Sequence, residues 1–294
     1  MTLEQLRIFL SVAELCHVTR AAERLNLTQS AVSAAIATLE RQYDVKLFDR
    51  IGRGIVLTEA GQLLIDAGQK VMDEASSARA LMLNLSQEPR GALRIWASQT
   101  IVSYWLTPRM MTMHRAWPLV DMSLHPGNTQ EVAQAVVDGT ADVGFIEGGM
   151  PSSDLRIRKV GHDELVLVLP RNHPLARKPR LDADDYRSLQ WLLREPGSGT
   201  RMVMEQHLKS MGLSVGDLRV LLQLPTNEAI LGGIRSGNCI AMLSWRSMRL
   251  AHKRAFAVRR VTWADKPRRN FSVLTDPRRF RTRAMTAFLD TFAI

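Results

Sequence analysis

Apolar residues recur at helical spacing in three consecutive stretches at the start of the chain, which predicts three short helices. The three apolar faces consist of Leu3, Leu6, Phe9, Leu10 and Ala13, of Val18, Ala21, Ala22 and Leu25, and of Val32, Ile36, Leu39 and Tyr43. Between the second and third faces, Asn26 favours a tight turn because asparagine tolerates the left-handed backbone conformation. We therefore expect the second and third helices to be joined by a short turn.

The third stretch leaves small polar side chains on its outer face. Thr28 suits the N-cap of this helix. The first two turns then expose Gln29, Ser30 and Ser33, which are side chains that can reach base edges in the major groove. A helix-turn-helix at about 18–37 fits this pattern, and an ordinary three-helix bundle with a polar surface is the alternative.

Residues 45–58 predict a β-hairpin next to this helix. Gly52 and Gly54 supply the turn, and Arg50 and Arg53 lie at its tip. Arginines at the tip of such a wing are well placed to contact DNA phosphates or the minor groove.

The stretch from Glu59 to about Leu85 predicts one long helix, because it keeps helical spacing and contains no proline. Its apolar row, which we call the seam, consists of Ala60, Leu64, Ala67, Val71, Ala78, Leu81 and Leu85. A row of about four heptads needs a partner helix, which favours dimerisation. Packing of the helix against its own module is the alternative. Residues 86–91 then read as a hinge.

Beyond residue 91, expected strands and helices alternate. The strands are Leu93–Ala97, Val120–His125, Asp142–Glu147, Glu164–Leu169, Gln190–Arg194, Arg219–Leu224 and Cys239–Leu243. The helices lie near 101–116, 129–138, 200–211, 226–236 and 280–292. This alternation favours parallel α/β sheets, and a span of about 200 residues suggests two lobes.

Four strand-to-helix loops in this part carry hydroxyl and amide groups. In open parallel sheets, ligands bind beyond the carboxyl ends of the strands, where helix N-termini present free N–H groups. The polar residues of these loops include Ser98, Thr100, Asn128, Thr129, Thr200, Arg201 and Thr226. The set suits a small anion, to which Arg201 would supply charge. The alternative is that each loop is a plain helix N-cap.

Motifs in the first 60 residues carry a family resemblance. Four of them resemble the winged helix-turn-helix of LysR-type transcriptional regulators, namely LEQLRIFLSVAE, TRAAERLNLTQSAVSAAIATLE, LFDR and LTEAG. The resemblance implies an α+β multidomain fold: an all-α winged helix-turn-helix in 1–58, a linker helix in 59–88 that pairs two subunits, and a two-lobed α/β periplasmic-binding-protein-like effector domain in 91–294. Lobe 1 would comprise about 91–162 and 267–294, and lobe 2 about 163–266.

The same resemblance implies roles for individual residues. Those expected to face DNA are Thr28, Gln29, Ser30 and Ser33, with Arg50 and Arg53 in the wing. Those matching effector-contacting positions are Thr100, Asn128, Thr129, Thr200, Arg201 and Thr226. Glu147 would end a strand near this cleft, where it would contact a ligand proton or form a salt bridge with Arg201. The motifs LREPGSGTR and GNT also resemble the subgroup whose effectors are inorganic oxyanions or small metabolite anions.

Many family members differ from this chain within the third helix. They carry proline where this chain has Ser30, and a basic or amide pair where it has Ala34 and Ala35. We therefore expect fewer side chains to reach DNA from the middle of this helix.

The net charge of +10 favours a polyanionic partner, but most of the positive excess lies far from the predicted helix-turn-helix. Residues 1–60 hold seven basic and seven acidic groups, whereas the last 44 residues hold eleven basic and three acidic groups. The basic segment 263–283 is either a second nucleic-acid site or the solvated side of a strand and helix that touches another subunit. The DNA assignment therefore rests on the helix-turn-helix pattern.

Other function classes find no support in the 294 residues. Cys16 and Cys239 fit neither a disulfide framework nor a metal site, and no histidine pair has metal-ligand spacing. GSGT at 197–200 lacks the lysine of a P-loop, and Ser198 lacks the frame of a nucleophile elbow. No apolar stretch approaches the roughly 18 residues of a membrane-spanning helix. We expect a cytoplasmic protein without catalytic residues, metal or cofactor.

These observations predict a sequence-specific transcriptional regulator controlled by a small anionic effector, an oxyanion or small carboxylate, bound between two lobes. Its partners would be double-stranded promoter DNA and further copies of itself in a homodimer or homotetramer, with RNA polymerase a candidate partner. The alternatives are a constitutive architectural DNA-binding protein and an enzyme on the same two-lobed scaffold.

Overall fold

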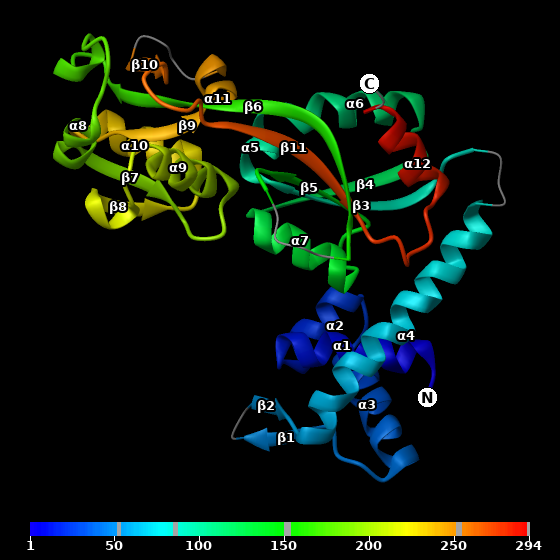
Figure 1. The fold of residues 1–294 in the computed structure, drawn as a ribbon. Helices are drawn as coiled ribbons and strands as arrows, with labels where there is room; N and C mark the ends of the chain where they lie inside the picture. The colour runs from blue at the N-terminus through cyan, green and yellow to red at the C-terminus, as the bar shows by residue number, and fades with distance from the viewer. Residues whose placement is uncertain (52–53, 85–87, 150–153, 251–254, 293–294) are drawn as a thin grey trace. The chain divides into compact units, whose positions relative to one another are not determined.

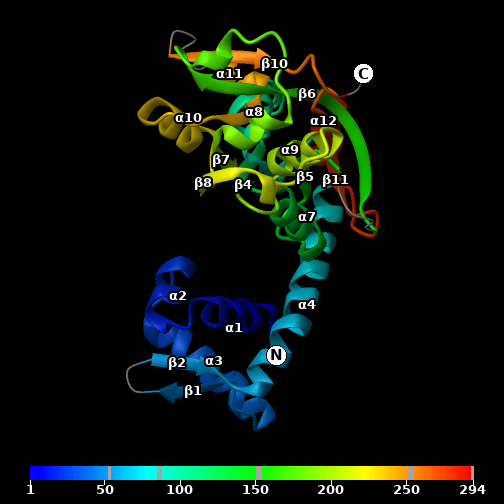
Figure 2. The same ribbon diagram turned by 60° about the vertical axis from the view of Figure 1, so that its left-hand side comes forward.

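The computed structural model describes residues 1–51, 54–84, 88–149, 154–250 and 255–292 (Figures 1 and 2). The chain divides into two compact units, Met1–Met82 and Leu83–Ile294. Each unit has its own apolar core. Among the described residues, no helix combines the length and the apolar character that crossing a bilayer requires.

Three helices form the centre of the first unit: α1 (Leu3–Leu15), α2 (Val18–Leu25) and α3 (Gln29–Tyr43). Their apolar faces pack into two clusters that contain the fully buried Phe9 and Val32. Asn26 ends α2 with a φ of 54°, the left-handed turn expected from the sequence. Tyr43 was expected in the core but is exposed, because it lies at the last residue of α3 and accepts a hydrogen bond from the N-terminal amine.

A hairpin and a long helix complete this unit. Strands β1 (Phe48–Ile51) and β2 (Gly54–Leu57) pair antiparallel, and α4 spans Glu59–Asn84. Helix α4 approaches α1 closely at Gly68, where a Cβ would lie only 2.8 Å from Leu6 Cδ1. Four seam residues are nevertheless exposed, namely Ala67, Val71, Ala78 and Leu81.

Lobe 1 of the second unit is built on one sheet covered by helices. Its strands are β3 (Gly91–Ser98), β4 (Val120–Gly127), β5 (Val143–Glu147), β11 (Arg268–Thr275) and the first half of β6 (Arg156–Pro170). Its helices are α5 (Gln99–Ile101), the π-helical η1 (Val102–Leu106), α6 (Thr107–Ala116), α7 (Thr129–Asp138) and α12 (Arg283–Asp290). Phe145, Phe271 and Phe288 fill the core between sheet and helices.

Lobe 2 has a second layered arrangement around the other half of β6. Its further strands are β7 (Gln190–Arg194), β8 (Arg219–Leu224), β9 (Ala241–Ser244) and β10 (Phe256–Arg260). Its helices are α8 (Ala183–Ser188), α9 (Gly199–Ser210), α10 (Asn227–Ser236) and α11 (Trp245–Leu250), with 3₁₀ turns η2 (Pro174–Ala176) and η3 (Val215–Asp217). Tyr186 and Trp191 are the largest fully buried side chains of its core.

Strand β6 belongs to both lobes and is visible as the long curved strand in Figures 1 and 2. Its residues from Arg156 to Glu164 pair with β11 in lobe 1, and those from Leu165 onward pair with β9 and β10 in lobe 2. Glu164 and Arg268 are partners in the register. The chain therefore enters and leaves lobe 2 through two adjacent strands.

The predicted fold class, a helix-turn-helix module followed by a two-lobed α/β domain, is confirmed, and the expected parallel pairing holds for only part of the sheets. β3 pairs parallel with β4 and β5, and β7 pairs parallel with β8, whereas β6 and β11 run antiparallel to their neighbours. Strand β11, which comes from near the end of the chain, lies between β5 and β6 and runs antiparallel to both. The sequence reading also missed β10, β11 and the first half of β6, whose arginines obscure the apolar alternation.

Candidate functional site

The outer face of α3 presents the polar residues singled out in the sequence. Gln29, Ser30 and Ser33 are all exposed. Thr28 caps the helix by accepting a hydrogen bond from Ala31 N at 3.2 Å, and its hydroxyl lies 3.0 Å from that of Ser30. Thr28 and Ser30 are thus engaged within the unit, whereas Gln29 and Ser33 present exposed side chains on this face.

Glu40 fixes the hairpin relative to α3. Its carboxylate accepts hydrogen bonds from Leu47 N at 2.8 Å and Phe48 N at 3.3 Å, and pairs with Lys46 Nζ at 3.0 Å. Burial alone would raise the pKa of Glu40, but these hydrogen bonds and the lysine lower it below its usual value. The sequence analysis did not predict this role for Glu40. The usable signal was its position, since it lies near the end of a predicted helix that is followed directly by a predicted hairpin.

The two wing arginines cannot be placed in the same way. Arg53 lies outside the described residues, and Arg50 lies on β1 with a side chain that is not among those described. Their roles at DNA stay predictions.

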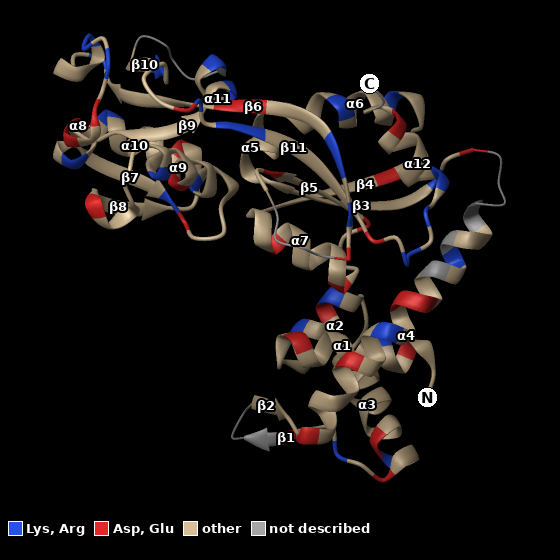
Figure 3. Cartoon of the chain, viewed as in Figure 1, with Lys and Arg blue, Asp and Glu red and all other residues tan. Residues whose placement is uncertain are grey.

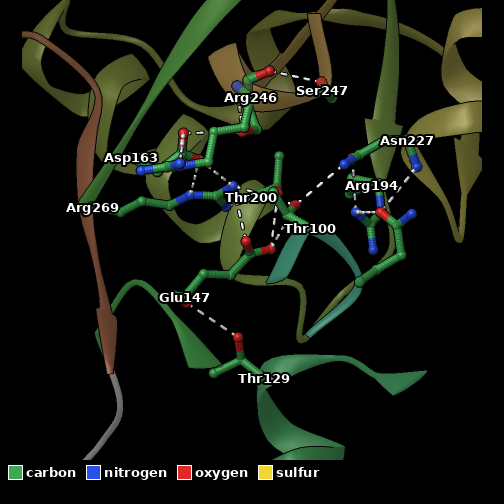
Figure 4. Close-up of polar contacts among 12 residues, drawn as sticks. Thr100, Thr129, Glu147, Asp163, Arg194, Thr200, Asn227, Arg246, Ser247 and Arg269 are labelled. Carbon is green, nitrogen blue, oxygen red and sulfur yellow. Dashed lines mark hydrogen bonds and ion pairs between the residues drawn. The ribbon is translucent and has the colours of Figure 1, made fainter. Parts of the chain in front are cut away.

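Glu147 forms the centre of a polar junction between the two lobes (Figure 4). It ends β5 of lobe 1, and its side chain is 2% exposed. Its Oε1 accepts hydrogen bonds at 3.3 Å from Thr100, at the start of α5, and from Thr200, at the start of α9 in lobe 2. Thr129 donates to the backbone oxygen of Glu147 at 3.2 Å. Three of the predicted threonines thus gather around the predicted carboxylate.

The charge partner of Glu147 is Arg269 on β11. Arg269 Nη2 lies 2.9 Å from Glu147 Oε2 and 2.8 Å from Asp163 Oδ2, and Nη1 donates to Thr200 at 2.8 Å. All three charged side chains are at most 2% exposed. Burial raises the pKa of Glu147, and the attraction of Arg269 opposes that rise without cancelling it. The junction therefore holds a carboxylate that gains a proton more readily than an exposed glutamate.

A second set of contacts joins α5 and η1 to lobe 2. Asn227 donates to Thr100 Oγ1 at 3.2 Å and accepts from the buried Arg194 at 3.0 Å. Glu228 accepts hydrogen bonds from Gln99, at 2.6 Å, and from Tyr104. The lobes are therefore connected directly by their own side chains.

The same junction contains two buried hydroxyls, those of Ser98 and Ser198. Each residue is 2% exposed, and neither Oγ finds a hydrogen-bond partner among the described residues. Each serine is the N-cap residue of its helix, α5 or α9, but makes no capping hydrogen bond. The approach between the lobes is tight here, since a Cβ on Gly199 would lie 2.1 Å from Glu147 O. A ligand at this point would have to move the lobes or replace some of these contacts.

The remaining predicted residues lie around this junction in other roles. Asn128 and Thr226 cap α7 and α10. Arg201 pairs with Glu205 at 2.8 Å and also bonds Arg194 O and Gln223, so of the two alternatives for Glu147 the salt bridge with Arg201 is wrong. Arg201 lies in the first turn of α9 and binds groups of its own lobe, while Arg269 occupies the position beside Glu147.

The sequence did not single out three junction residues, namely Asp163, Arg194 and Arg269, whereas Asn227 belongs to the predicted loop Pro225-Thr226-Asn227. Arg269 belongs to the basic segment that was expected to be solvated, yet its side chain is fully buried. The period-two pattern Arg269, Phe271, Val273 was a usable signal, because alternate residues of a strand share one face.

Two family models match the chain. The first, the bacterial regulatory helix-turn-helix protein of the lysR family, matches residues 3–62, and the LysR substrate binding domain matches residues 86–293. A helix-turn-helix module joined to a two-lobed binding domain defines a transcriptional regulator rather than an enzyme. The chain belongs to the LysR family of such regulators.

Curated relatives agree with this assignment. The uncharacterized HTH-type transcriptional regulator YeiE of Escherichia coli K12 is 37% identical over 246 residues, covering 84% of this chain and 81% of that protein. A probable RuBisCO transcriptional regulator of Trichormus variabilis is 33% identical over 293 residues, covering 98% of this chain and 86% of that protein.

Solved structures share the fold at lower identity. Full-length CbnR in complex with its target DNA superposes with a TM-score of 0.72 at 19% identity, over 99% of both chains. The regulatory domain of CcmR from Synechocystis PCC6803, in complex with 2-PG, superposes with a TM-score of 0.62 at 22% identity, over 69% of this chain and 96% of that one.

Proposed function

We propose that this regulator binds promoter DNA as a homodimer or homotetramer and responds to a small anion bound between its two lobes. The observation that carries the proposal is the pair of buried, unpartnered hydroxyls of Ser98 and Ser198, at the starts of two helices whose threonines Thr100 and Thr200 both bond Glu147. Buried polar groups are normally hydrogen-bonded, so two such hydroxyls in one place favour a missing partner.

An anion suits the charges at the junction. Arg194 and Arg269 are buried there, and the raised pKa of Glu147 allows this carboxylate to take up a proton when a second negative charge arrives. A protonated Glu147 would release Arg269 to the anion and could itself donate a hydrogen bond. The 2-phosphoglycolate bound to the CcmR regulatory domain is a small anion of the proposed kind.

In this proposal, anion binding affects DNA binding through the relative position of the two lobes. Glu147, Asn227 and Glu228 join the lobes directly. An anion that replaces part of these contacts changes the relative free energy of lobe arrangements, by no more than its difference in affinity for them. Paired subunits would transmit that change to the spacing of their helix-turn-helix modules.

The DNA-binding part of the proposal assigns Gln29, Ser30 and Ser33 to bases or nearby phosphates and keeps Arg50 and Arg53 as wing contacts. Exposed seam residues such as Val71 and Leu81 support pairing of α4 with the same helix of a second subunit.

A thermal-shift screen of sulfate, thiosulfate, phosphoglycolate and small carboxylates tests the effector. At least one anion should stabilise the wild type, and the double variant S98A/S198A should lose most of that shift. The matched control S188A/S236A removes two exposed hydroxyls of lobe 2 and should keep it. If no anion stabilises the wild type while promoter binding is intact, the constitutive architectural function is correct instead.

A further inference from the structure

Two consecutive residues of the π-helical turn η1 contact different parts of the second unit. Trp105 is 5% exposed and packs in lobe 1, with its ring 5.2 Å from that of Phe271 on β11. It also lies against β6, since a Cβ on Gly161 would be only 3.2 Å from Trp105 Cζ2. The preceding residue, Tyr104, donates a hydrogen bond to Glu228 on α10 of lobe 2. This single turn, of a kind that is rare and frequent at functional sites, therefore contacts both strands that connect the lobes and also lobe 2 itself.

Glu228 accepts a second hydrogen bond from lobe 1. Gln99 Nε2 lies 2.6 Å from Glu228 Oε2, whereas Tyr104 bonds Oε1, so each carboxylate oxygen has a donor from the other lobe. Burial and the bond to Glu228 raise the pKa of Tyr104, so its hydroxyl keeps the proton that it donates. Residues 98–107 contain no charged side chain and are coloured tan in Figure 3. The contact, which we call the latch, is therefore one carboxylate held by two neutral donors.

The latch is accessible to water, unlike the contacts around Glu147. Glu228 is exposed, and Gln99 and Tyr104 are half-buried, whereas Glu147 and Arg269 are at most 2% exposed. When the latch opens, water can bond its donors and its acceptor, so no buried polar group is left unsatisfied. Each of its hydrogen bonds then changes the ratio of closed to open molecules by a factor of about ten, as is usual for a bond to a charged group.

Gln99 connects the latch to the proposed effector site. Its Oε1 accepts hydrogen bonds from Asn227 N at 3.3 Å and from Arg194 Nη1 at 3.4 Å. Arg194 is one of the two arginines assigned above to the anion, and Ser98 directly precedes Gln99 in the chain. An anion that attracts Arg194 or bonds Ser98 would therefore weaken the hold of Gln99 on lobe 2.

We propose that Gln99, Tyr104 and Glu228 form a latch that opposes effector binding and so sets the concentration at which the regulator responds. This inference rests on the anion site proposed above. An anion at the junction has to move the lobes or replace contacts between them. The apparent affinity of a ligand falls in proportion to the fraction of molecules in the arrangement that binds it. The latch lowers that fraction, and the loss of either of its bonds raises it.

Hydrogen–deuterium exchange at the backbone amide of Asn227 in the full-length protein measures how often the latch opens, because this N–H donates to Gln99 across the lobes. Tyr104→Phe removes one bond of the latch and leaves those of Gln99 in place, and it should speed exchange about tenfold. Glu228→Ala removes both bonds and should speed exchange further. The control Asp138→Ala removes an exposed carboxylate that accepts a hydrogen bond of the same 2.6 Å length within α7, and it should change exchange less than twofold.

Faster exchange in Glu228→Ala but not in Tyr104→Phe would reflect only a freed Gln99 side chain and would overturn the latch. Unchanged exchange in both variants would overturn it as well.

Calorimetric titration with sulfate and with phosphoglycolate tests the link to the effector. An anion that binds the wild type should bind both latch variants more tightly, by at most the factor by which their exchange is faster, and should bind Asp138→Ala like the wild type. Equal or weaker binding in the latch variants, despite faster exchange, would mean that the latch does not oppose the effector. If neither anion binds any of the four proteins, the effector site proposed above fails, and the exchange rates alone decide whether the latch holds the lobes together.

Discussion

The outer face of α3 and the junction between the lobes use polar side chains in opposite ways. On α3, small uncharged groups such as Gln29 and Ser33 are exposed to water, and the fold does not depend on them. At the junction, Glu147, Asp163 and Arg269 are fully buried and depend on one another. The exposed face of α3, which we propose contacts DNA, can therefore change at little cost in stability, whereas the side chains that join the lobes are part of the core.

The largest effect on this comparison should come from Arg269→Met. The variant leaves Glu147 buried without its cation and leaves Asp163 only the more distant Arg246, whose Nε lies 3.9 Å away. Breaking a buried ion pair in this way destabilises proteins by about 3–5 kcal/mol. Urea unfolding of the second unit measures the loss. The neighbouring variant Arg268→Met removes an arginine whose side chain is 68% exposed and should stay within about 0.5 kcal/mol of the wild type. Similar values for both variants would contradict the structural role of the junction.

A smaller loss is expected from Glu40→Ala in the first unit. Leu47 N and Phe48 N lose their acceptor, which costs about 1–3 kcal/mol and frees the wing. Because the pKa of Glu40 is lowered in the folded state, its contribution is present above the ordinary pKa near 4.5 and is lost as the pH falls through the folded-state value. Promoter affinity and thermal unfolding both report the change, and Glu23→Ala on the exposed side of α2 is the control. Unchanged promoter affinity would show that the wing does not need this anchor.

Glu147→Gln should mainly change how the free energy of unfolding varies with pH, and should change the free energy at a single pH less. The raised pKa means that the folded protein takes up this proton more readily than the unfolded chain. The contribution of Glu147 is therefore full below its ordinary pKa of 4.5 and declines as the pH rises through the folded-state pKa. Relative to the glutamine variant, the wild type should lose at most about 1.4 kcal/mol per pH unit over that range. Unfolding curves at several pH values measure the difference. A parallel pH profile for the two proteins would refute it, and Glu205→Gln serves as a surface control.

The smallest effect on stability should come from Gln29→Ala. We expect a change of less than about 0.5 kcal/mol in unfolding, because the side chain is exposed. Discrimination between promoter and scrambled DNA should fall by about 1–3 kcal/mol, the usual value of one good base contact. Fluorescence anisotropy on both duplexes measures this, with Gln62→Ala on α4 as the control. Equal loss on both duplexes would assign Gln29 to the phosphates.

The helix-turn-helix was readable from the sequence because its information is local. Thr28, Asn26 and the faces around Phe9 and Val32 act within a few turns of helix, where caps and periodicity decide the structure. The threonines of the junction were found for the same reason, since each begins a helix.

The pairing of Arg269 with Asp163 could not be found by local rules, because it joins strands more than 100 residues apart. Alternation along β11 marks Arg269 as a residue of the inner face, but an arginine in a basic stretch is ordinarily solvated, and only the register of β11 with β5 and β6 supplies its partners. Arg201 shows the converse. Its sequence context suited a ligand, but a glutamate one turn further along α9 takes its charge.

The adjacency of Glu164 and Arg268 makes lobe 2 an insertion into lobe 1 with neighbouring entry and exit points. A segment of this kind can be exchanged as a cassette, since its removal requires only that two paired strands be reconnected. Transplanting residues 165–267 between family members would then carry the lobe 2 half of the proposed effector site to a new host and leave the helix-turn-helix module and the sheet of lobe 1 unaltered. Such chimaeras offer a direct route to regulators that keep one promoter and respond to another metabolite.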